Sequence, residues 1–80
     1  MSEISRLRWQ CRRGAKELDL VLEEYLRDVY PGAPAAAQRA FAALLDLPDP
    51  VLLAYLMGHE QPADPEQLRV VESLQRAPGN

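Results

Sequence analysis

A chain of 80 residues is long enough for one small domain, which buries about 60–65% of its unfolded surface and is expected to have modest stability. A net charge of −3 argues against a general nucleic-acid binder. The single cysteine excludes an internal disulfide framework, and one cysteine far from one histidine makes a metal site unexpected. No apolar run is long enough to span a membrane and no signal peptide is recognised, so a cytoplasmic protein without membrane contact is expected.

The charge is unevenly distributed along the chain. Residues 1–16 hold five basic residues and one acidic residue (+4), whereas residues 17–80 hold four basic and eleven acidic residues (−7). A basic face on an acidic body favours steering towards an acidic partner.

Helical patterns dominate the sequence, and strand patterns are nearly absent. Helices are predicted over residues 5–13, 15–29, 35–46, 50–57 and 65–76. The fold class is therefore expected to be all-α, a compact bundle of about five short helices. We expect a single domain over residues 1–80, with an ordered core at residues 6–76 and a disordered tail at residues 77–80.

Glycine, proline and capping residues set the limits of these helices. Gly14 is expected to end the first helix, and the segment 30–34 ends the second because proline disfavours helix at the residue before it. Asp49 is predicted to cap the fourth helix at its N-terminus and Gly58 to cap its C-terminus. Asp64 is predicted to cap the fifth, with the glutamine three residues later completing a capping box.

Apolar side chains recur every three or four residues and define the expected core. In chain order they are Leu7 and Cys11; Leu18, Val21, Leu22, Tyr25, Leu26 and Val29; Ala37, Ala40, Phe41, Leu44 and Leu45; Leu52, Leu53, Tyr55, Leu56 and Met57; and Leu68, Val71 and Leu74. Cys11 is predicted to be a buried small apolar residue rather than a nucleophile, because no histidine or aspartate lies near it in sequence.

The densest positive charge lies beside a glycine and is followed by carboxylates, in the run from Arg12 to Asp19. Glu17 follows Arg13 by one helical turn, so both side chains are expected to point the same way. From the spacing alone two interpretations remain open. One is a helix break with an ordinary surface pair, and the other is a mixed-charge docking site with a flat spot at Gly14.

The run from Arg6 to Asp19 (RLRWQCRRGAKELD) resembles the signature of the SdhE family, whose hallmark is an Arg-Gly-x-x-Glu motif. The resemblance continues through FAALL at residues 41–45, DP at 49–50, YLMGH at 55–59 and PAD at 62–64, and covers about residues 6–75. Tyr55 stands where the family often has tryptophan. Residues 31–37 are rich in alanine and proline, and the role of this loop is undetermined.

The resemblance implies a five-helix fold and a non-enzymatic function. Members bind the flavoprotein subunit of succinate dehydrogenase, and in some bacteria that of fumarate reductase, and promote covalent attachment of FAD to a histidine of that subunit. We expect a monomer that forms a one-to-one complex with its client. The FAD belongs to the client, and no stable FAD binding by this chain is expected because it lacks a glycine-rich fingerprint.

Two alternative functions remain, and the first would use the same surface on a different partner. The family has also been described as an antitoxin acting on cytoskeletal proteins, which would make the chain a regulatory interaction module. The other is a small nucleic-acid binder that uses the face of Arg8, Arg12 and Arg13, which the net negative charge disfavours.

The resemblance and the local chemistry together nominate six partner-binding residues and no catalytic or metal-binding residue. They are Arg13, Gly14, Glu17, Arg12, Arg8 and Trp9. Arg13 offers a planar fork, Gly14 allows close backbone approach, and Trp9 is expected to pack under the motif and hold it rigid. Asp19 is expected to interact with the helix dipole. For His59 a structural role in a loop is expected, and a contact at the edge of the interface stays open.

Overall fold

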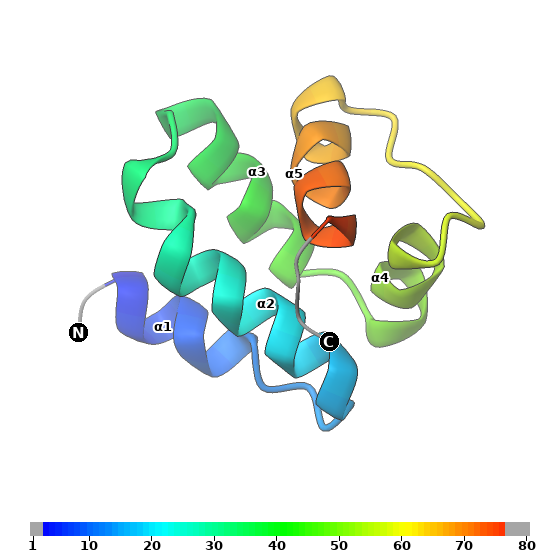
Figure 1. The fold of residues 1–80 in the computed structure, drawn as a ribbon, viewed down its shortest axis with the longest axis horizontal. Helices are drawn as coiled ribbons and strands as arrows, with labels where there is room; N and C mark the ends of the chain where they lie inside the picture. Colours follow the sequence, from blue (N-terminus) through cyan, green and yellow to red (C-terminus); the bar gives the residue numbers. More distant parts are fainter. Residues whose placement is uncertain (1–2, 77–80) are drawn as a thin grey trace.

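A computed structural model describes residues 3–76 of the chain (Figure 1). The predicted disordered tail at residues 77–80 lies outside the described residues. The elements are α1 (Glu3–Gln10), α2 (Lys16–Asp28), the 3-10 helix η1 (Tyr30–Gly32), α3 (Ala35–Leu45), α4 (Asp49–Leu56) and α5 (Pro65–Gln75). Because no strand occurs within residues 3–76, the all-α prediction is confirmed.

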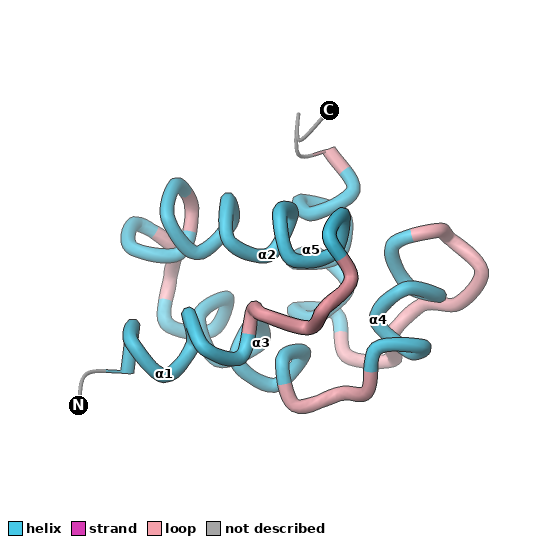
Figure 2. Tube along the Cα trace, turned by 90° about the horizontal axis from the view of Figure 1, so that it is seen from below, coloured by secondary structure: helices cyan, strands magenta, loops and turns pink. Residues whose placement is uncertain are grey.

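Four helices form two layers around the core. α1 and α3 lie in one layer and α2 and α5 in the other, and each helix packs against both of its neighbours around this square (Figure 2). α4 packs beside α5, at the side of the molecule away from the start of the chain (Figure 1). Within the described range, no helix has the length and apolarity needed to cross a membrane.

Apolar side chains from all five helices fill the centre. The buried ones are Leu7, Cys11, Leu18, Leu22, Tyr25, Leu26, Tyr30, Ala40, Phe41, Leu44, Leu45, Leu52, Val70, Val71 and Leu74. Phe41 is fully buried and stacks on Tyr25 with ring centroids 4.6 Å apart. The ring of Tyr30 also contacts Phe41, with centroids 5.8 Å apart. Aromatic pairs at these separations contribute beyond the area they bury.

Three predicted core residues are exposed, and two buried residues, Tyr30 and Val70, were not predicted. Val29, expected in the core, is 42% exposed because it lies past the last residue of α2. Leu53 and Met57 are also exposed. Val70 is buried although its position was not predicted, because it lies one turn before Leu74 on the face of α5 that packs into the bundle.

The C-terminal cap of α4 and the N-terminal cap of α5 are confirmed. Gly58 has a φ of 80° and donates its N–H to Tyr55 O at 3.1 Å, while His59 N–H donates to Ala54 O at 2.9 Å, which is the Schellman arrangement. The Asp64 carboxylate caps α5 by accepting from Glu66 N–H at 2.8 Å. This bond uses the second residue of the helix, whereas a capping box uses the third.

Two predicted helix limits are wrong. α1 ends at Gln10, not at residue 13, because Cys11 and Arg12 turn their N–H groups to Leu7, Arg8 and Trp9 carbonyls in a closing turn. Asp49 is not the N-cap of α4. Pro48 takes that position with extended backbone, and Asp49 is already helical. Its carboxylate accepts a hydrogen bond from the Arg13 side chain instead.

Candidate partner-binding site

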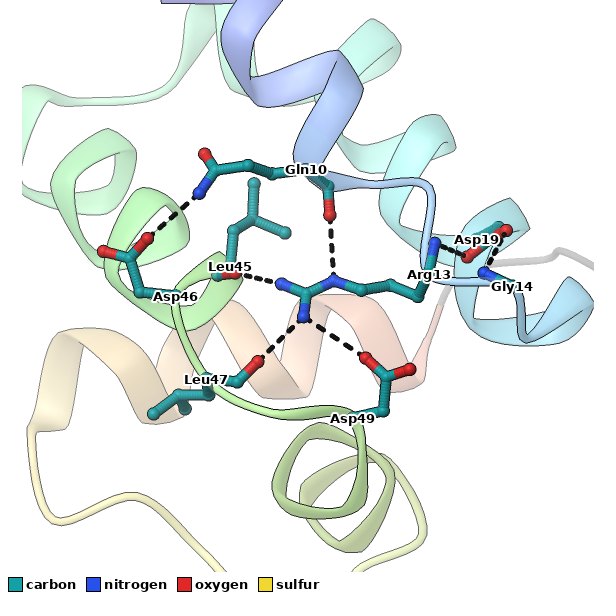
Figure 3. Close-up of polar contacts among 8 residues, drawn as sticks. All are labelled: Gln10, Arg13, Gly14, Asp19, Leu45, Asp46, Leu47 and Asp49. Carbon is teal, nitrogen blue, oxygen red and sulfur yellow. Dashed lines mark hydrogen bonds and ion pairs between the residues drawn. The ribbon is translucent and has the colours of Figure 1, made fainter.

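The Arg13 side chain connects the loop after α1 to the segment between α3 and α4 (Figure 3). Its Nε donates to Gln10 O at 2.8 Å, and its Nη1 donates to Leu47 O at 2.8 Å and to Asp49 Oδ1 at 3.2 Å. Its Nη2 donates to Leu45 O. Only 14% of the side chain is exposed. We refer to this set of bonds as the Arg13 clamp.

The clamp satisfies carbonyl groups that have no partner within a helix. Leu45 is the last residue of α3, and the final carbonyls of a helix lack intrahelical donors and carry partial negative charge. A guanidinium supplies several N–H donors in one plane together with a positive charge, which suits this position. Gln10 Nε2 adds a second link to the same segment by donating to Asp46 Oδ1 at 3.0 Å.

The backbone of the same loop is held from its other side by Asp19. Its Oδ1 accepts from Arg13 N–H at 2.7 Å, and its Oδ2 accepts from Gly14 N–H at 3.3 Å (Figure 3). Asp19 lies in the first turn of α2, where a carboxylate also interacts favourably with the helix dipole. The Arg-Gly loop is therefore fixed by its side chain towards α3 and α4 and by its backbone towards α2.

These contacts correct the role predicted for Arg13. All three guanidinium nitrogens donate within this chain, so the fork is not offered to a partner. The expectation that Arg13 and Glu17 point the same way is also wrong, because Arg13 lies outside α2, which begins at Lys16. Arg13 positions the loop, and the outward surface consists of other residues.

Gly14 and Glu17 lie at the surface of this anchored loop. Gly14 has a φ of 84°, in the left-handed region that L-residues avoid, and a Cβ placed there would meet nothing within 4 Å. The backbone conformation therefore favours glycine, and the space in front of it is open. Glu17 is exposed in the first turn of α2, and within residues 3–76 its carboxylate has no hydrogen-bonding or ionic partner.

Trp9 lies outside the core, contrary to expectation. Its side chain is 71% exposed, because Leu7 and Cys11 form the buried stripe of α1 and Trp9 lies about 200° around the helix from Leu7. The Arg12 guanidinium lies 5.9 Å from the centre of the indole ring, within the range of a cation–π contact. Arg8 and Arg12 are both exposed. This part of the surface therefore presents a large aromatic ring beside two positive charges.

Arg8 and Arg12 separate two hollows. An open groove of about 440 Å³ runs between α1 and α2, and it is lined by Ile4, Arg8, Arg12, Glu23, Leu26, Arg27 and Pro31. A smaller hollow of about 260 Å³ is lined by Ser5, Arg8, Trp9 and Arg12. Both have cationic rims, which would suit acidic groups of a partner.

Two further residues complete the description. Burial raises the pKa of the Cys11 thiol from its ordinary value of 9.0 to about 11, and the nearby Glu23 carboxylate adds to the shift. A thiol with this pKa is protonated at neutral pH, and Cys11 is confirmed as a buried residue. His59 is exposed in the loop after α4, where its backbone N–H belongs to the helix cap. Within residues 3–76 no cluster of three or more metal-ligating side chains occurs.

Comparison with known proteins identifies the family. The profile of the family described as "flavinator of succinate dehydrogenase" matches residues 5–78. The chain belongs to this family. A relative from Legionella pneumophila (strain Lens), named FAD assembly factor SdhE, is 44% identical over 72 residues, which cover 90% of each chain. Proteins of the same name from Shewanella oneidensis and Methylococcus capsulatus are 41% and 40% identical, over 89% and 99% of this chain and 87% and 95% of their own length.

In this member of the flavinator family the residues of the Arg-Gly-x-x-Glu motif do not all point the same way. Arg13 points inward to the clamp, whereas Gly14 and Glu17 face outward. Of the residues nominated from the sequence, Gly14, Glu17, Arg8 and Arg12 do face outward, whereas Trp9 was expected beneath the motif and Arg13 at the surface. The inward partners Gln10, Asp46 and Asp49 were missed because their pairing depends on how α3 and α4 return to the loop.

Proposed function

We propose that this chain is an FAD assembly factor that docks on the flavoprotein subunit of succinate dehydrogenase and promotes covalent attachment of FAD. Membership of the flavinator family and the names of its relatives support the proposal. The structural observation that carries it is the anchored Arg-Gly loop. Arg13 and Asp19 hold the loop from opposite sides, so the backbone that carries Gly14 is already ordered before binding.

The docking surface proposed here consists of Gly14, Glu17, Trp9, Arg8 and Arg12, with Arg13 as a positioning residue. Trp9 supplies a large apolar side chain of the type that dominates binding energy at protein interfaces. Arg8 and Arg12 supply the charge that steers an acidic partner. Gly14 lets the backbone of the partner approach the loop closely.

The assistance we propose is conformational rather than catalytic. Covalent attachment requires a histidine of the flavoprotein to be held against the flavin ring while negative charge develops on the ring, and this geometry lowers the barrier. A partner that binds this arrangement more tightly than others raises its population. The chemistry and the FAD then belong to the client, and this chain acts as a non-enzymatic binding protein. Its affinity for the client falls once attachment is complete.

The proposal includes the setting and the stoichiometry. We propose that the chain acts in the cytoplasm as a monomer that forms a one-to-one complex, and that the flavoprotein of fumarate reductase is a second client. Gel filtration with light scattering on mixtures of the purified proteins measures both points, because a one-to-one complex has the summed mass of one copy of each.

The decisive experiment measures covalent flavin on the succinate dehydrogenase flavoprotein by in-gel fluorescence after the gene is deleted and restored. Deletion is expected to abolish most of the fluorescence, and the wild type is expected to restore it. Glu17→Ala should fail to restore it, whereas the matched control Glu72→Ala, at an exposed position on α5, should succeed. Fluorescence that is unchanged by deletion would refute the proposal and favour the antitoxin-type alternative.

A further inference from the structure

α4 is apolar on nearly all of its faces, yet this chain leaves one of them exposed. After Asp49 and Pro50 the helix reads Val-Leu-Leu-Ala-Tyr-Leu, and Leu52 is its only fully buried residue. α4 packs chiefly against α5. Leu53 is 37% exposed, and Met57, at the C-terminal cap, is 66% exposed. A helix without a polar face is normally covered on all sides, so the uncovered face calls for a partner.

The exposed face of α4 is continuous with the docking loop. The carboxylate of Asp49 accepts from Arg13, which holds the Arg-Gly loop. Leu53 lies four residues after Asp49 and Met57 four residues after Leu53, so the three side chains follow one side of the helix. We call Leu53 and Met57 the α4 stripe. It extends the docking surface away from the clamp.

Both ends of α4 are fixed, so the α4 stripe is preorganised. The N-terminal end is attached to the loop through Arg13 and Asp49, 3.2 Å apart. At the other end the Schellman cap closes the helix, and Gln75 Nε2 of α5 donates to Tyr55 O at 2.9 Å. The backbone of a stripe held in this way loses little conformational entropy when it binds.

We propose that the α4 stripe docks on an apolar patch of the same flavoprotein client that contacts Gly14 and Glu17, an inference that rests on the proposed function. A second copy of the chain is a poorer occupant. A stable dimer buries about 800 Å² on each partner, and two partly exposed side chains cannot supply that area on their own. The Arg13–Asp49 pair places the stripe next to the Arg-Gly loop, so one partner docked on the loop can also cover the stripe.

The test compares substitutions that keep the fold. Leu53→Gln/Met57→Gln removes the apolar stripe, and Met57→Gln alone changes only a residue that is 66% exposed and therefore cannot unfold the domain through lost burial. Val29→Gln is the matched control, because it removes an exposed apolar side chain at the end of α2. Dissociation constants for the purified flavoprotein, not yet covalently flavinylated, are measured by biolayer interferometry at two salt concentrations.

The double variant is expected to bind roughly tenfold or more weakly, and Met57→Gln alone severalfold more weakly, by the same factor at both salt concentrations. Val29→Gln should bind like the wild type. Equal affinity of the wild type and both stripe variants would overturn the inference while leaving the proposed function intact. Sedimentation that shows a wild-type dimer abolished in the stripe variants, with client affinity unchanged, would assign the stripe to a second copy instead. A wild-type chain that does not bind the flavoprotein would refute both proposals.

Discussion

Arg13 and Asp49, 36 residues apart in the chain, form an ion pair with Nη1 and Oδ1 at 3.2 Å. The pair joins the loop after α1 to the first turn of α4. Because the same guanidinium also donates to the carbonyls of Leu45 and Leu47, one side chain closes the gap between two segments of the bundle. The Arg-Gly loop and α4 are therefore held together by the same side chain, which links the stability of the fold to the proposed function.

We expect Arg13→Lys to destabilise the domain by about 2–3 kcal/mol, because a single ammonium cannot reach the four acceptors of the guanidinium and leaves partly buried carbonyls without donors. Urea denaturation followed by circular dichroism measures the change. Arg12→Lys is the control, because Arg12 is exposed and contacts the Trp9 ring. Equal stability of the two variants would show that the clamp contributes nothing beyond charge.

Two substitutions at Gly14 distinguish its role in the backbone conformation from its role in partner contact. Gly14→Ala should destabilise the fold by about 1 kcal/mol because φ is 84°, and Gly14→Asn should cost less because asparagine tolerates the left-handed region. Neither side chain meets an atom within this chain. If the partner approaches the loop closely, both variants lose affinity for the flavoprotein although Gly14→Asn is nearly as stable as the wild type. Wild-type affinity in Gly14→Asn would mean that the glycine serves the fold alone.

The sequence predicts best what depends on neighbours along the chain. Gly58 and Asp64 end and begin helices through bonds to residues within five positions, and both were placed correctly. Trp9 could also have been placed correctly, since Leu7 and Cys11 define the buried side of α1 and Trp9 lies opposite. Its aromatic character misled the prediction.

The clamp could not be predicted in the same way. Two of the four acceptors of the Arg13 side chain are backbone carbonyls 32 and 34 residues further along, and a carbonyl carries no signature in the sequence. Asp49 illustrates the ambiguity. An aspartate before proline is typical of an N-cap, but Pro48 takes that position, and the carboxylate is released to pair with Arg13. Whether such an aspartate caps its helix or pairs with a distant side chain depends on contacts between segments far apart in the chain.

The buried Cys11 thiol predicts a loss of stability at alkaline pH. Its pKa is raised to about 11 in the folded chain, so the unfolded chain loses the proton first as the pH rises above 9.0. The protonated thiol makes its full contribution to the free energy of unfolding below pH 9. This contribution, roughly 2–3 kcal/mol, is lost as the pH rises to about 11. Burial also raises the pKa of Tyr25, which acts in the same direction.

Comparison of the slopes isolates the thiol. Free energies of unfolding are measured between pH 8 and 11 for the wild type and Cys11→Ala. The variant is less stable at every pH below 9 because it leaves a small cavity, but its stability should fall less steeply above pH 9 because only the tyrosines remain. Parallel curves would mean that the folded thiol titrates near its ordinary pKa.

The cationic rim of the α1–α2 groove should control how fast the client is found. Replacing both Arg8 and Arg12 by glutamine removes two exposed charges, and the association rate constant with the flavoprotein is expected to fall about tenfold at low salt because long-range attraction is lost. Stopped-flow fluorescence of the mixed proteins measures the rate. The difference should shrink as salt is added, since screening removes the same attraction in the wild type.

A matched control shows whether position or net charge matters. Arg39→Gln/Arg69→Gln removes the same number of charges from exposed positions on α3 and α5 and should leave the association rate close to that of the wild type. If both double variants slow association equally, the client responds to the overall charge of the chain, and the groove is not the steering surface. If only the first variant is slow, and its dissociation rate is nearly unchanged, Arg8 and Arg12 guide the encounter while Trp9, Gly14 and Glu17 hold the complex together.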